Sequence, residues 1–159
     1  MTEASPPSSS PNRWLIAGGW LSLAASLLHV ACIFGGPDWY RFFGAGEAMA
    51  QAAERGSWTP PVMTLGIAAL LALWAWYAFA GAGVVRRLPL MRTALVLISV
   101  IYLLRGLALV PIAFTPAAQT PFNIWSSLIV LGYGLCYAIG TWRAWSSLSQ
   151  RKVSHALGS

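Results

Sequence analysis

The chain has 159 residues, of which 57% are hydrophobic and only 9% are charged. Soluble domains carry roughly 25% charged residues, so this composition excludes an ordinary globule with a water-facing surface. The net charge of +6 comes from basic residues beside apolar segments, a pattern typical of cytoplasmic membrane flanks. We therefore expect an integral membrane protein that has membrane lipids as partners and binds no nucleic acid.

Residues 1–12 are rich in serine and proline and poor in apolar side chains, which predicts a disordered tail. We expect no cleaved signal peptide, because the apolar run that follows is too long and lacks a small-residue cleavage site. The segment 147–159 is predicted to be a second polar tail. Residues 13–146 then form one predicted domain.

Four apolar segments in this domain predict an all-α, four-transmembrane-helix bundle, because each reaches the ~20 residues that cross a hydrocarbon core. A Gly-Gly-Pro sequence closes the first segment. Two prolines begin the second, in the first helical turn, where a missing amide costs little. The predicted spans are 14–34, 60–85, 90–114 and 121–145.

The distribution of Lys and Arg predicts the orientation of these spans. The 86–92 turn and the C-terminal flank are basic, and Arg13 precedes the first span. The 36–59 connection balances two arginines with three acids, and the 115–120 connection has no charge. Both termini are therefore expected in the cytoplasm, and in a bacterial inner membrane the other two connections would face the periplasm.

The long outer connection, 36–59, has apolar and polar residues at helical spacing. This pattern predicts one or two short amphipathic helices that lie at the outer interface. The aromatic residues within 39–43 would anchor this segment, and Gly44 and Gly46 would bend it.

Arg105 lies near the middle of the third predicted span, slightly to its outer side. A charge at this depth costs at least ~2.5–3.5 kcal/mol, so the side chain must face the bundle interior or water. No acidic residue lies in any predicted span. Its possible partners are then a carboxylate of the outer connection, an anionic ligand, or carbonyl and hydroxyl groups of other helices.

His29 lies in the first predicted span, on a stripe of small and polar residues that is typical of helix packing. It is either a neutral, hydrogen-bonded structural histidine or a group that lines a cavity. We expect no metal and no cofactor, because no second ligand stands at a suitable spacing. Cys32 and Cys136 lie in different spans and are predicted to be free thiols.

The aromatic band at 74–77 in the second span is expected to face lipid or the inner interface. In the fourth span, small residues recur at four-residue spacing, which favours close helix packing or a homodimer contact. These residues are Gly132, Cys136 and Gly140.

The predicted topology brings several polar residues to the outer half of the bundle and predicts a pocket that opens outward. Its candidate ligand-binding residues are His29, Asp38, Tyr40, Glu47, Tyr102 and Arg105. The first functional hypothesis is a non-enzymatic protein that binds, or also transports, a small anionic or lipid-like molecule. The second is a membrane-embedded enzyme that uses His29 as acid or base and Arg105 as an anion-stabilising group, assisted by a carboxylate of the outer connection, Glu47 or Asp38. The third is an accessory subunit of a larger membrane complex.

Overall fold

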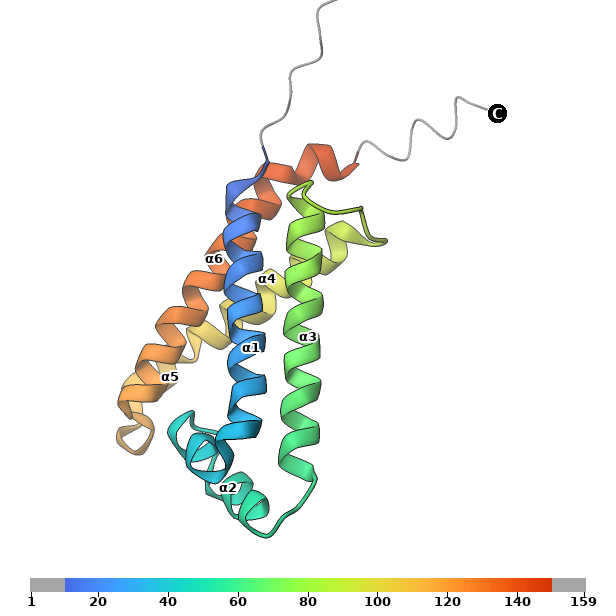
Figure 1. Cartoon of the computed structure of the whole chain (residues 1–159). Coiled ribbons are helices and arrows are strands. Elements are labelled where there is room, and N and C mark those ends of the chain that lie inside the picture. Colours follow the sequence, from blue (N-terminus) through green and yellow to red (C-terminus); the bar gives the residue numbers. More distant parts are fainter. Residues whose placement is uncertain (1–10, 150–159) are drawn as a thin grey trace, which may run out of the picture.

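The computed structural model describes residues 11–149, and Figure 1 shows its helices in chain order. Four helices in this part of the chain are long and apolar enough to cross a membrane, as the sequence predicts. The elements are α1 (Arg13–Phe42), α2 (Glu47–Glu54), α3 (Thr59–Gly81), α4 (Met91–Leu107), α5 (Leu109–Phe114), the 3-10 turn η1 (Pro116–Ala118) and α6 (Pro121–Ser149).

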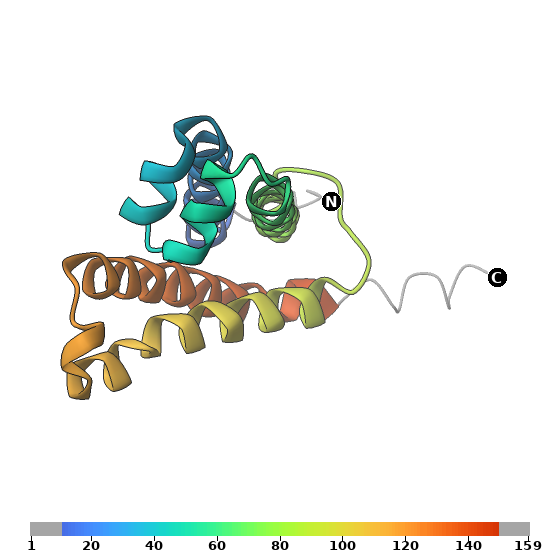
Figure 2. The ribbon, with the colours of Figure 1, turned by 90° about the horizontal axis from the view of Figure 1, so that it is seen from below.

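The long helices form two antiparallel hairpins, α1 with α3 and α4 with α6, which lie as two layers in Figure 2. The layers meet mainly where α1 packs along α6, whereas α3 has few neighbours on α4 or α6. The start of α1, the α3–α4 connection and the end of α6 lie at one end of the molecule, here called the basic end. The opposite end, which carries α2 and α5, is called the α2 end.

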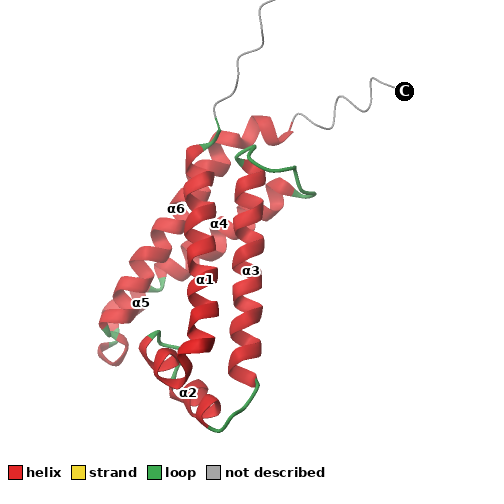
Figure 3. Cartoon of the chain, in the orientation of Figure 1, coloured by secondary structure: helices red, strands yellow, loops and turns green. Residues whose placement is uncertain are grey.

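Over the described residues, all regular structure is helical, with loops only between helices (Figure 3). The outer connection holds two short helical pieces. The first is the last part of α1, which follows a kink at Gly36 (φ 68°, ψ −154°) and begins with Pro37. The second is α2, and positive φ angles at Gly44 and Gly46 turn the chain between them. These glycines allow backbone angles that other residues rarely adopt.

The third predicted span is interrupted, whereas its apolar pattern predicts one continuous helix over 90–114. α4 ends at Leu107 and α5 begins at Leu109. Pro111 explains the break, because it has no amide to donate to the Leu107 carbonyl four residues earlier, and its ring crowds that carbonyl.

Other boundaries differ more modestly from those predicted. α3 ends at Gly81, before the predicted bound at 85, and α6 continues to Ser149, into the predicted C-terminal tail. At the start of α1, the Asn12 side chain accepts hydrogen bonds from the Trp14 and Leu15 amides and so caps the helix. The remainder of both predicted tails lies outside the described residues.

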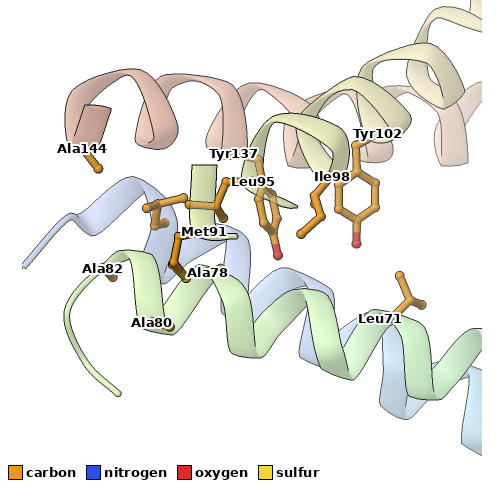
Figure 4. Packing of buried hydrophobic residues seen from close by; sticks show 11 residues of the cluster. Leu71, Ala78, Ala80, Ala82, Met91, Leu95, Ile98, Tyr102, Tyr137 and Ala144 are labelled. Atoms are coloured by element: carbon orange, nitrogen blue, oxygen red, sulfur yellow. The ribbon is translucent and has the colours of Figure 1, made fainter. Parts of the chain in front are cut away.

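The core lies where the two hairpins meet, and Figure 4 shows its buried side chains. Leu15, Leu95 and Tyr137 are fully buried. Helices α1 and α6 approach closely at Gly140, where an added Cβ would lie 3.0 Å from the Leu15 amide nitrogen. The prediction that the aromatic band faces lipid or the inner interface is wrong for Trp74, because this side chain packs against the core.

Candidate functional site

A chain of buried hydroxyl groups joins all four long helices. Ser22 on α1 lies 2.9 Å from the Tyr102 hydroxyl on α4 and 2.8 Å from the Tyr137 hydroxyl on α6. The Tyr137 hydroxyl donates at 3.1 Å to the carbonyl of Trp74 on α3. Ser22 and Tyr137 are fully buried, and Tyr102 is 5% exposed. Figure 4 shows both tyrosine hydroxyls pointing toward the α1–α3 hairpin.

The direction of these hydrogen bonds is fixed by the carbonyl at one end of the chain. A carbonyl only accepts, so the Tyr137 proton points to Trp74. Ser22 must then donate to Tyr137, and Tyr102 must donate to Ser22. The Tyr102 ring also packs edge-on against Trp74, with ring centroids 5.0 Å apart. The candidate ligand residue Tyr102 is thus already occupied with packing and hydrogen bonding inside the protein.

Arg105 is exposed, and its described partners are neutral. Its Nη1 donates to the Ser127 hydroxyl at 3.1 Å, and its Nη2 donates to the Ser126 hydroxyl at 3.4 Å. Both serines belong to α6, and Ser127 is fully buried. The salt bridges found between residues 11 and 149 do not involve Arg105. Two hydroxyl groups orient the guanidinium, but they do not neutralise its charge.

The acids of the outer connection pair with Arg41 and not with Arg105. The Arg41 guanidinium lies 2.9 Å from a Glu47 oxygen, 2.7 Å from a Glu54 oxygen and 3.5 Å from an Asp38 oxygen. The hydrogen bond from Arg41 holds the pKa of the Glu47 carboxyl below its ordinary value of 4.5. This network ties α2 to the end of α1, which is a structural role for Asp38 and Glu47.

The two remaining predicted site residues also have contacts within the protein. The His29 Nδ1 lies 2.8 Å from the carbonyl of Ala25, one turn earlier in α1. Since a carbonyl only accepts, the His29 Nδ1 carries a proton and donates it to Ala25. Tyr40 is 4% exposed, and its hydroxyl accepts at 3.5 Å from Thr64 on α3.

A shallow, open groove of about 520 Å³ lies between α4 and α6, toward the basic end and away from Arg105. This groove does not lie in the outer half of the bundle, where the predicted topology places a pocket. The groove walls are almost entirely apolar. They are formed by Val96, Ser99, Val100, Leu103, Ala138, Thr141, Trp142 and Trp145.

The small-residue ladder of α6 does not form one uniform face. Gly140 packs on Leu15 of α1, whereas an added Cβ on Gly132 would meet nothing within 4 Å. The closest contacts of α6 with α4 use other glycines: an added Cβ on Gly106 would lie 2.7 Å from the Leu131 Cα. Cys32 and Cys136 are both free thiols, as predicted.

In comparisons by sequence and by structure, the chain matches no known protein family, no curated protein and no solved structure. Within residues 11–149, no group of three His, Cys, Asp or Glu side chains is placed to hold a metal ion.

The sequence places Ser126 and Ser127 of the fourth span near the level of Arg105, and hydroxyl groups of other helices are among the partners expected for Arg105. The sequence does not predict the contacts of Ser22, which falls on the packing stripe of the first span, or those of Tyr137. The available signal was a hydroxyl group on the first, third and fourth spans, at Ser22, Tyr102 and Tyr137. The second span contributes a backbone carbonyl, which no sequence pattern marks. Helical spacing gives the face on which a hydroxyl lies but not the helix that it contacts.

Proposed function

We propose that the chain is an integral membrane protein with both termini in the cytoplasm, and that Arg105 binds the anionic group of a small or lipid-like molecule. In a bacterial inner membrane this molecule would approach from the periplasmic side. The proposed role is binding, and transport of the same molecule would use the same site.

The proposed orientation is supported by the distribution of charge over the two ends. The basic end carries Arg13, Arg86, Arg87 and Arg143. Among residues 11–149, no acidic residue lies at this end. The three described acids lie at the α2 end, in the outer connection, with Arg41 and Arg55. The positive-inside rule places an end rich in Lys and Arg in the cytoplasm.

The anion site is supported by the partners of Arg105, which is the observation that carries the proposal. A guanidinium at membrane depth calls for a counter-charge or water, and its partners are the neutral hydroxyls of Ser126 and Ser127. The carboxylates of the outer connection, which were possible partners of Arg105, are bound by Arg41 instead. A phosphate or carboxylate would supply the missing charge through short, charge-assisted hydrogen bonds.

The depth of Arg105 suits an amphipathic ligand. Ser127 lies six residues into α6 from its start at Pro121, which is ~9 Å along the helix axis. In a hydrocarbon core ~30 Å thick, the guanidinium would lie in the outer third. A ligand with an anionic group and an apolar tail could reach it without crossing the membrane.

Native mass spectrometry of the purified protein tests this proposal. We expect the wild type in neutral detergent to retain a phosphatidylglycerol that Arg105→Gln fails to retain, and Arg105→Lys to bind it more weakly. Arg55→Gln, at the same end of the molecule, is the matched control and should bind as the wild type does. The proposal is wrong if Arg105→Gln binds the same number of lipids with the same affinity.

A further inference from the structure

The groove between α4 and α6 combines apolar walls with an unsatisfied polar group. Thr141 lines the groove and is 4% exposed, and its hydroxyl has no hydrogen-bond partner among the described residues. A helical threonine usually donates to the carbonyl four residues earlier, but this one does not. Buried hydroxyls in proteins nearly always have a partner, so this hydroxyl calls for one that the described residues do not supply. Its oxygen is covered by neighbouring side chains, and a molecule in the groove reaches it by a small shift of those side chains.

A cation stands at the end of the groove nearest the basic end. The Arg92 guanidinium carbon lies 4.5 Å from the centroid of the Trp145 ring, and Trp145 is a wall of the groove. Arg92 Nη2 donates at 2.7 Å to the Trp145 carbonyl, while its Nε is buried without a partner. Arg92 takes part in no salt bridge within the described segment. Its charge is therefore available to an anion.

We propose that this groove binds an anionic phospholipid of the cytoplasmic leaflet. The acyl chain lies along the apolar walls, the phosphate contacts Arg92, and an ester carbonyl accepts from the Thr141 hydroxyl. Thr141 and Trp145 are one helical turn apart, ~6 Å along the axis, so the polar contacts lie close together at the headgroup end. Tryptophans and basic residues are the side chains that gather at this interface.

The size of the groove fits part of this ligand. Its volume of about 520 Å³ is that of a small-molecule site, roughly 300–1,000 Å³, so the groove would hold one acyl chain and not the whole lipid. The proposal rests on the membrane insertion proposed above but not on Arg105. The two sites use different side chains of α4 and α6, so each can be substituted separately.

The experiment counts bound lipids in the Arg105→Gln variant, so that the outer site is absent. Native mass spectrometry follows its titration with phosphatidylglycerol and with phosphatidylcholine of the same acyl chains. Adding Arg92→Gln should weaken phosphatidylglycerol binding at least tenfold, because a charge-assisted contact is lost. Ala138→Leu, which fills the groove, should abolish binding.

Thr141→Val separates ligand binding from a structural role. It removes only the unpartnered hydroxyl, so the lipid-free thermal stability should be unchanged or higher, while phosphatidylglycerol binding weakens about threefold or more. The proposal is overturned if both lipids bind equally, if the three substitutions leave phosphatidylglycerol binding unchanged, or if the groove instead joins two copies of the chain.

Discussion

Replacing Ser22 by alanine should destabilise the fold far more than the loss of one oxygen atom suggests. Ser22 contacts both the Tyr102 and the Tyr137 hydroxyls, and it is fully buried. The substitution removes two hydrogen bonds between helices at once. It also leaves the hydroxyl proton of Tyr102 without its acceptor, the Ser22 oxygen.

The magnitude follows from these two losses. Hydrogen bonds between helices in membranes contribute on average ~0.6 kcal/mol each, so two bonds contribute about 1.2 kcal/mol. A stranded buried donor costs ~1–3 kcal/mol. Because the site can relax partly around the missing oxygen, we expect Ser22→Ala to lower the free energy of unfolding by ~1–3 kcal/mol.

The donor-to-acceptor order of these hydrogen bonds gives a sharper prediction for Tyr102→Phe. This substitution removes the terminal donor and strands nothing, because Ser22 still donates to Tyr137. Its cost should be ~0.6 kcal/mol. In the double variant no donor is stranded at position 102, so its cost should be less than the sum of the two single costs, by ~1 kcal/mol.

Reversible unfolding by SDS in mild detergent, followed by circular dichroism, measures these free energies. Ser99→Ala is the matched control, since Ser99 is also buried but donates to the carbonyl of Leu95 within its own helix. It should cost less than ~0.5 kcal/mol. Equal effects of Ser22→Ala and Ser99→Ala, or strict additivity in the double variant, would refute the directed hydroxyl chain.

Two further predictions concern helix packing and pH. Gly106→Ala should lower the unfolding free energy by ~1–3 kcal/mol, because its Cβ would lie 2.7 Å from the Leu131 Cα; Gly132→Ala, which meets nothing within 4 Å, should be neutral or mildly stabilising in the same SDS titration. The Glu47 pKa is lowered in the folded state by Arg41, so its stabilising effect is complete above pH 4.5 and is lost as the pH falls through the depressed value. Thermal melts from pH 6 to pH 3 should therefore show a fall in Tm that is absent in Arg41→Gln, and equal falls would show that this ion pair is irrelevant.

The sequence predicted the four long helices because apolar length alone identifies such segments. It did not predict the break at Ala108, although Pro111 was visible, because a proline near a helix end is compatible with either a kink or a break. Of the partners expected for Arg105, hydroxyl groups of another helix are the ones observed. The acids of the outer connection bind Arg41 instead, which lies only six residues from Glu47.

Cysteine labelling in sealed cells tests the central claim, which is a membrane protein whose Arg105 site opens to the outer side. In a chain without Cys32 and Cys136, the account predicts that a membrane-impermeant thiol reagent labels Ser57→Cys at the α2 end. Arg105→Cys should be labelled more slowly, and Ser147→Cys at the basic end only after permeabilisation. Labelling of Ser147→Cys in intact cells, with Ser57→Cys and Arg105→Cys protected, would contradict both the orientation and the site.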